Sequence, residues 1–279
     1  MAPRFGLLVL SMSLIGCQRE RPAVDSPPSP RGSGVVRAPA EPAAAKTALG
    51  SMLPDLDLLE VPGYEPAVFS TPPDKSQPRP LVVVAHGAGG RPEWHCELWS
   101  HIVGDRAFVL CPRGRRQDVR IPTEDATCYF PHHHYLRAVV EASIAALQNQ
   151  ASSPLDCAEA VYVGYSQGAT MGALFLPTSP RFARALLVEG GFSEWNIPIA
   201  LRFREHGGRR VALVCGTPRC AAGATQSASW LQQGGLVARA IHVAHAGHSS
   251  FGAMAERLPD VFRWLTENDP RFRPPRVAK

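Results

Sequence analysis

A serine between two glycines marks the segment of this chain that is best suited to covalent chemistry. Residues 161–169 read Val-Tyr-Val-Gly-Tyr-Ser-Gln-Gly-Ala, which contains the pattern G-x-S-x-G. An apolar run precedes Gly164 and small residues follow Gly168, so the pattern predicts a sharp turn from a strand into a helix. Such a turn holds Ser166 in a strained conformation with its hydroxyl exposed, and the N–H of Gln167 points toward developing negative charge. The segment predicts a nucleophilic serine.

Two other segments place useful groups directly after predicted strands. Residues 86–90 read His-Gly-Ala-Gly-Gly and follow an apolar run, and their glycines let the backbone approach a substrate closely. His248 lies after the last predicted strand, and a histidine accepts and returns protons near neutral pH because its ordinary pKa is near ~6.5. His242 and His245 compete for that role, but His242 lies inside the strand and His245 just beyond it.

Together these segments resemble the motifs of serine esterases of the α/β-hydrolase superfamily, in its carboxylesterase and dienelactone-hydrolase branches. The resemblance covers roughly residues 60–268 and rests on the order of elements and on the motifs quoted above. It implies that Ser166 is the nucleophile and His248 the general base. It also implies two oxyanion donors, the amides of Gln167 and Ala88, with that of Gly89 next in line. No metal or organic cofactor is implied.

The acid of the triad departs from the pattern of that family. The family usually keeps it after the strand that precedes the histidine strand, but here residues 215–220 read Cys-Gly-Thr-Pro-Arg-Cys. No Asp or Glu occurs between Glu205 and Glu256. Three alternatives follow: the acid has moved, the site is a Ser–His dyad, or the protein is a hydrolase relative without catalysis.

Glu189 is our candidate for the moved acid. It ends the apolar run of residues 185–188, where a carboxylate is unfavourable unless it has a partner. The chain order Ser166, Glu189, His248 matches the order of nucleophile, acid and base in the α/β-hydrolase fold. Glu194 is the reserve candidate, and a Glu189 that is paired with backbone amides or an arginine is the structural alternative.

Short β-rich runs alternate with longer helical stretches along most of the chain. Several of the runs are continuously apolar, as in strands that are buried on both faces of a parallel sheet. This alternation predicts an α/β fold with a doubly wound, mostly parallel sheet. The resemblance to serine esterases implies that this is the α/β-hydrolase fold. The predicted strands are 67–70, 81–85, 107–111, 160–164, 185–189, 211–215 and 238–243, and the predicted helices are 93–103, 133–149, 168–176, 197–206, 225–233 and 251–267.

Two charged clusters could mimic binding sites. Residues 132–134 are three histidines at a predicted helix start, but adjacent helical residues point in different directions and no Cys or carboxylate at i+4 completes a site, so we expect no metal. Residues 113–116 read Arg-Gly-Arg-Arg and follow a strand at the expected ligand end. They form either a solvated loop or an attractive surface for an anionic substrate.

The N-terminus resembles that of a bacterial lipoprotein. Arg4 and the mostly apolar residues 5–15 are typical of a signal peptide, and residues 14–17 (Leu-Ile-Gly-Cys) resemble a lipobox. We therefore expect a signal peptide over 1–16, a lipid on Cys17 and a location in the cell envelope. The Pro-rich stretch that follows, to residue 55, is expected to be a disordered tether. The catalytic domain is expected over 56–270, followed by a basic tail over 271–279.

Composition excludes several classes of protein. Charged residues make up 19% and apolar residues 45% of the 279 residues, which is inconsistent with a wholly disordered chain. No apolar run approaches the ~20 residues of a membrane span. The net charge of +5 is concentrated in solvated ends, so we expect no nucleic acid partner. Export permits disulfides, and Cys215 and Cys220 are the most plausible pair because four residues separate them.

The sequence as a whole predicts a lipid-anchored serine hydrolase that cleaves carboxylic esters through an acyl-enzyme. Its partners would be a small ester substrate and the membrane that holds the anchor. A peptidase or a lactone hydrolase on the same fold is the principal alternative. A binding lipoprotein without catalysis is the alternative from a different class.

Overall fold

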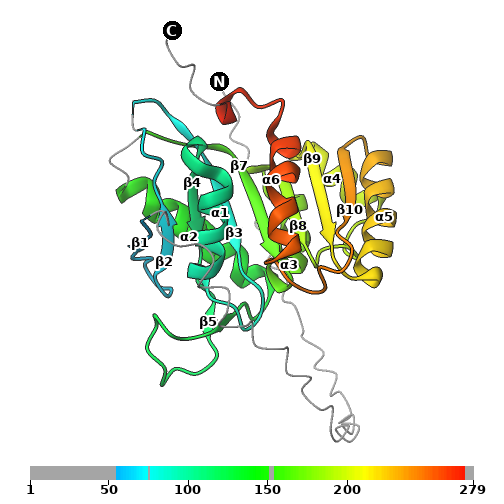
Figure 1. The fold of residues 1–279 in the computed structure, drawn as a ribbon. Helices are drawn as coiled ribbons and strands as arrows, with labels where there is room; N and C mark the ends of the chain where they lie inside the picture. Colours follow the sequence, from blue (N-terminus) through cyan, green and yellow to red (C-terminus); the bar gives the residue numbers. More distant parts are fainter. Residues whose placement is uncertain (1–54, 75, 151–153, 274–279) are drawn as a thin grey trace, which may run out of the picture. The chain divides into compact units, whose positions relative to one another are not determined.

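An eight-stranded, mostly parallel sheet forms the centre of the computed structural model (Figure 1). Six neighbouring strands, β4, β3, β7, β8, β9 and β10, run parallel. At one edge of the sheet β2 pairs antiparallel with β4, and β1 pairs antiparallel with β2. This architecture confirms the predicted doubly wound fold. In spatial order the strands are β1 (Asp57–Leu59), β2 (Ala67–Ser70), β4 (Phe108–Cys111), β3 (Arg79–Ala85), β7 (Leu155–Tyr165), β8 (Phe182–Val188), β9 (Arg210–Cys215) and β10 (Val237–His242).

The structure describes residues 55–74, 76–150 and 154–273. The predicted signal peptide, Cys17 and nearly all of the tether lie outside the described residues. Within these ranges no helix is both long and apolar enough to cross a bilayer.

Six helices cover the two faces of the sheet. Because both faces are buried, successive residues of a strand enter different cores: Val83 packs in one hydrophobic cluster, and Val82 and Val84 pack in the other. One cluster is closed by α1 (Pro92–Val103) and α6 (Ala253–Thr266), and the other by α2 (His133–Gln150), α3 (Gln167–Phe175), α4 (Ile197–Glu205) and α5 (Pro218–Gln233).

Four elements differ from the prediction. Helix α5 begins at Pro218 rather than at residue 225, because proline is well suited to a first helical turn, where its missing N–H is not needed. Strand β1 is only three residues long and was not predicted. A small antiparallel pair, β5 (Arg115–Arg116) and β6 (Cys128–Tyr129), was also missed, since two-residue strands carry no periodicity.

The folded domain extends beyond residue 270, where the basic tail was expected to begin. Pro270–Phe272 form a 3₁₀ turn in which the Phe272 side chain is buried. Arg271 forms ion pairs with Asp269 at 2.7 Å and with Asp156 at 3.1 Å. The prediction of a solvated end is therefore wrong for Arg271 and Phe272, because Arg271 also pairs with the distant Asp156 and Phe272 packs against Phe262.

Two disulfides link described cysteines. The Cys215–Cys220 bridge confirms the predicted pair, and Cys96–Cys111 joins α1 to β4. Cys128 and Cys157 are buried free thiols.

Candidate active site

Ser166 lies at a sharp turn between β7 and α3. Its φ angle is 49°, a left-handed conformation that is unfavourable for a residue with a side chain, and its amide donates to the carbonyl of Val188 at 2.8 Å. The flanking glycines are needed for close packing. A Cβ on Gly164 would lie 2.6 Å from the Cα of Ala169, and one on Gly168 would collide with the carbonyl of Ala85.

The structure brings Ser166, His248 and Glu189 into one chain of hydrogen bonds. The Nε2 atom of His248 lies 2.8 Å from the Oγ of Ser166, and its Nδ1 atom lies 2.9 Å from a carboxylate oxygen of Glu189. The three residues follow β7, β10 and β8, so their proximity results from parallel strands that end at one edge of the sheet. His242 and His245 take no part in this chain, and Glu194 bonds to Ser193 instead.

Glu189 is held in a ring of donors. Its side chain is 1% exposed, and it accepts from the amide of Gly216, from the amide of Thr217 at 2.9 Å and from the hydroxyl of Thr217 at 3.1 Å. Burial alone would raise the pKa of this carboxyl, but the bonds from His248 and from the two amides outweigh burial and lower the pKa. Glu189 is therefore ionised at neutral pH. These two amides belong to the loop of residues 215–220, which contains no Asp or Glu.

The ionised carboxylate determines the tautomer of His248. A carboxylate can only accept hydrogen bonds, so the Nδ1 atom of His248 carries the proton that it donates to Glu189. The Nε2 atom then carries a lone pair directed at the hydroxyl of Ser166. The hydroxyl of Tyr165 donates to the carbonyl of His248 at 3.0 Å and holds the histidine loop against the serine turn. Tyr165 was not identified as a site residue from sequence.

Two backbone amides are available beside Ser166. Gln167 is the first residue of α3, so its N–H has no partner within the helix. In the facing loop, the amides of Gly89 and Gly90 already donate to Cys128 and Gly87. The amide of Ala88 has no acceptor among the described residues, so it is available as a donor. The loop lies close to Ser166, since a Cβ on Gly87 would be 3.2 Å from the Cβ of Ser166.

His86 fastens the loop of Ala88 to a neighbouring segment. Its Nδ1 atom donates to the carbonyl of Gly87 at 2.7 Å, and its Nε2 atom accepts from the amide of Gly114 at 3.1 Å. Burial lowers the pKa of His86 to about 4, so the ring stays neutral and keeps both bonds at neutral pH. His95, which is also fully buried, packs against Tyr165, and burial lowers its pKa to about 3.

We expect the stability of the fold to fall as the pH drops from about 6.5 to 4. His86 and His95 bind a proton less readily in the folded chain than in the unfolded chain, so unfolding takes up protons in this range. Each histidine should lower the free energy of unfolding by about 2–3 kcal/mol at pH ~4.5 relative to pH ~7.5. Urea titrations at the two pH values measure this loss, which His95→Phe should reduce and His101→Gln, at an exposed position of α1, should not. Equal losses in all three proteins would contradict the assignment.

The Cys215–Cys220 bridge encloses the segment that holds Glu189. Gly216 and Thr217, which supply three of the donors to the carboxylate, lie between the two cysteines. The bridge therefore restricts the motion of the donors that orient the acid.

Removing this bridge should lower both the activity and the stability of the protein. In a Cys215→Ala/Cys220→Ala variant we expect kcat for an ester to fall about tenfold, a loss comparable to that of one hydrogen bond to a charged group. Opening so short a loop should lower the free energy of unfolding by only about 2 kcal/mol. The matched control is Cys96→Ala/Cys111→Ala, which removes the bridge between α1 and β4. Equal kcat values in the two double variants would show that the bridge has no role in positioning Glu189.

The arginine cluster is not the uniformly solvated loop considered from sequence. Arg113 is fully buried and pairs with Glu93, and it also donates to the carbonyls of Pro66 and Thr123. Arg115 is exposed, and its guanidinium lies over the ring of Tyr135 at 5.0 Å. The distinction depends on tertiary partners, so the pattern Arg-Gly-Arg-Arg did not reveal it.

No group of described residues has the character of a metal centre. The one cluster of potential ligands, Glu189 with Cys215 and Cys220, has its sulfurs in a disulfide and its carboxylate bonded to His248 and amides. His133 and His134 lie in the first turn of α2, at its partly or fully exposed end. The residues present therefore do not fit a bound ion.

Comparison with known proteins identifies the fold. No protein-family model matches the sequence, and no curated protein matches it. Among solved structures, esterase PE8 aligns with 74% of this chain and 99% of its own, at 19% identity and a TM-score of 0.54. A dienelactone hydrolase-like promiscuous phosphotriesterase from metagenomic libraries aligns with 76% of this chain and 98% of its own, at 15% identity and a TM-score of 0.56.

A third similar structure is the acylaminoacyl peptidase of Pyrococcus horikoshii, at 12% identity and a TM-score of 0.55. The alignment covers 78% of this chain and 42% of the peptidase, so the chain corresponds to less than half of that protein. The likeness to these structures and the mostly parallel sheet establish the α/β-hydrolase fold.

Proposed function

We propose that this protein is a serine hydrolase that cleaves carboxylic esters through an acyl-enzyme intermediate. The observation that carries the proposal is the chain of hydrogen bonds from Ser166 through His248 to Glu189, 2.8 and 2.9 Å long. Nucleophile, base and acid in this geometry define a hydrolytic triad irrespective of the positions of the residues along a sequence.

Acylation begins when Ser166 attacks the carbonyl carbon of the ester. Its proton passes to the Nε2 atom of His248, and the resulting imidazolium is stabilised by the ionised carboxylate of Glu189. The amides of Gln167 and Ala88 stabilise the negative charge that develops on the carbonyl oxygen. The tetrahedral intermediate collapses as His248 returns the proton to the departing alcohol, which leaves an acyl group on Ser166.

Deacylation repeats these steps with water. His248 removes a proton from water, which attacks the acyl carbon, and then returns the proton to Ser166 as the acid product leaves. Half of the His248 side chain is exposed (52%), so water reaches the base directly. The same chemistry applies to lactones and to amides, and the class of substrate is a question for kinetics.

Covalent labelling tests the proposal directly. A fluorophosphonate probe should label the wild-type protein at Ser166, as located by peptide mass spectrometry, and should not label Ser166→Ala. The wild-type enzyme, before labelling, should turn over aryl esters faster than matched anilides. A protein that stays unlabelled would favour a binding function without catalysis, and faster turnover of anilides or lactones would favour the peptidase or lactonase alternatives.

We also propose that the protein is anchored in the cell envelope through a lipid on Cys17, on the basis of residues 14–17. Acyl chains on one cysteine give stable membrane attachment because each buried methylene contributes about 0.8 kcal/mol. Cys17→Ser should therefore move the protein from the membrane fraction to the soluble fraction, with its esterase activity retained. Immunoblots of the two fractions measure this shift. Membrane attachment equal to that of the parent would refute the lipid anchor.

A further inference from the structure

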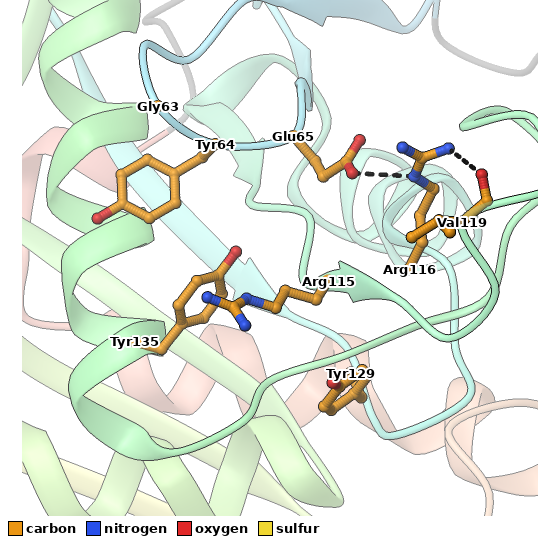
Figure 2. A pocket seen from close by; sticks show the side chains of 8 residues that line it. All are labelled: Gly63, Tyr64, Glu65, Arg115, Arg116, Val119, Tyr129 and Tyr135. Carbon is orange, nitrogen blue, oxygen red and sulfur yellow. Dashed lines mark hydrogen bonds and ion pairs between the residues drawn. The ribbon is translucent and has the colours of Figure 1, made fainter.

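A cavity of about 660 Å³ lies between the segment before β2, the β5–β6 pair and the start of α2 (Figure 2). Its walls carry three phenol rings, two guanidinium groups and one carboxylate. They belong to Tyr64, Tyr129, Tyr135, Arg115, Arg116 and Glu65. The cavity is thus polar and aromatic, unlike the apolar groove that a long acyl chain would require.

One positive charge in this cavity has no counter-ion. Arg116 is neutralised by Glu65 at 2.9 Å and donates to the carbonyl of Val119, as Figure 2 shows. Arg115 forms no ion pair with any carboxylate among the described residues. It rests instead on the ring of Tyr135, with its guanidinium exposed to the cavity. An exposed guanidinium without a carboxylate partner is suited to bind a planar anion.

The phenol rings extend the recognition surface around this charge. Tyr64 and Tyr135 meet edge to face with their centroids 5.7 Å apart. Burial raises the pKa of Tyr135, so its hydroxyl keeps its proton and can donate to an anion. A flat group can pack on these rings while its charge meets Arg115.

Tyr129 connects this cavity to the catalytic serine. The preceding residue, Cys128, accepts from the amide of Gly89 at 2.9 Å in the oxyanion loop. The following residue, Phe130, donates its amide to the side chain of Gln167 at 2.8 Å, directly after the nucleophile. The segment that lines one side of the cavity is therefore bonded on both sides to the segments that carry the two oxyanion donors.

We propose that the cavity binds the carboxylate of an ester whose non-reacting end is flat and negatively charged. This inference rests on the proposed hydrolase function and adds the class of substrate. Arg115 binds the carboxylate, Tyr135 donates a hydrogen bond to it, and the rings of Tyr64 and Tyr129 cover its flat part. The amides of Gln167 and Ala88 do not contact this carboxylate. The cavity therefore determines which substrate is selected, and the triad carries out the reaction.

A pair of substrates that differ in charge tests the inference. The two substrates are the anion 4-acetoxybenzoate and the neutral 4-acetoxybenzamide. The ratio of their kcat/KM values should be higher for the wild-type enzyme than for Arg115→Gln. We expect the charged-to-neutral ratio of kcat/KM to fall about tenfold in Arg115→Gln, which is the effect of losing one charge-assisted hydrogen bond. Arg115→Lys should restore part of the ratio. The matched control is Arg120→Gln, which removes the same charge from an 86% exposed arginine outside the cavity and should keep the wild-type ratio.

Binding to an inactive protein separates this inference from the proposed function. In calorimetry, Ser166→Ala should bind 4-hydroxybenzoate, and adding Arg115→Gln should weaken that binding about tenfold. Equal binding by the single and double variants, or an unchanged charged-to-neutral ratio in Arg115→Gln, would overturn the anion subsite while leaving the hydrolase intact. A protein that binds the anion through Arg115 but hydrolyses no ester would instead overturn the proposed function.

Discussion

Replacing Ser166 with alanine is expected to lower kcat for a short-chain aryl ester by at least about 10⁴-fold, because no acyl-enzyme can form. His248→Ala should cause a loss of similar size, since the serine is not activated without its base. The double variant should be no worse than either single variant, because residues that act as one catalytic unit have non-additive effects. Steady-state rates and burst amplitudes with 4-nitrophenyl acetate measure all three.

The control for this experiment is Ser229→Ala, on α5, where a serine is removed far from the motif. Its activity should equal that of the parent. Circular dichroism and thermal unfolding establish that each variant is folded. Turnover within tenfold of wild type in a folded Ser166→Ala or His248→Ala protein would refute the proposed mechanism.

The second large effect is expected for Glu189→Gln, which preserves shape but removes the charge. The Oε1 side of the group faces the amides of Gly216 and Thr217, which require an acceptor, so the new NH₂ group would face His248. A donor in that position favours the tautomer of His248 with its proton on Nε2, and this tautomer cannot accept the proton of Ser166. We expect kcat to fall by at least ~10²-fold. The corresponding Asp→Asn change in a serine protease triad lowers kcat by about four orders of magnitude.

Glu194→Gln is the matched control, because Glu194 is partly exposed and, among the described residues, hydrogen-bonds only to Ser193. It should retain most of the activity. The pH dependence of kcat/KM in both variants distinguishes loss of the base's orientation from loss of fold. A Glu189→Gln enzyme that retains more than a tenth of wild-type kcat would indicate a Ser–His dyad.

Local sequence determined the serine turn and most of the sheet. The apolar run of β7, the glycines around Ser166 and the small residues of α3 are consecutive, and the steric need for Gly164 comes from Ala169, five residues further on. The same holds for strands β3 and β9, where continuous apolar runs indicate burial on both faces. These features were predictable because their physical causes lie within a few residues of one another.

Glu189 could be named from sequence as a candidate, by its place at the end of β8, but its partners could not. The donors Gly216 and Thr217 follow β9, and they reach the carboxylate only because β8 and β9 are paired in register. The loop after β9 has no acidic residue of its own, and its amides instead hold Glu189, which follows the neighbouring strand β8. Almost every residue has a backbone amide, so the residue types of this loop do not indicate that its amides bind a carboxylate.

Only the tertiary structure showed which side chains of the same type are buried, paired or exposed. Arg113 is buried against Glu93, whereas Arg115, two positions later, faces a cavity and has no carboxylate partner among the described residues. Cys96 pairs with Cys111, an outcome that six cysteines left open. In each case the sequence determined the kind of group and its place on a strand or loop, whereas the partner came from a distant segment. Charge pairing and disulfide formation depend on distances in space, which are set only when the strands take their order in the sheet.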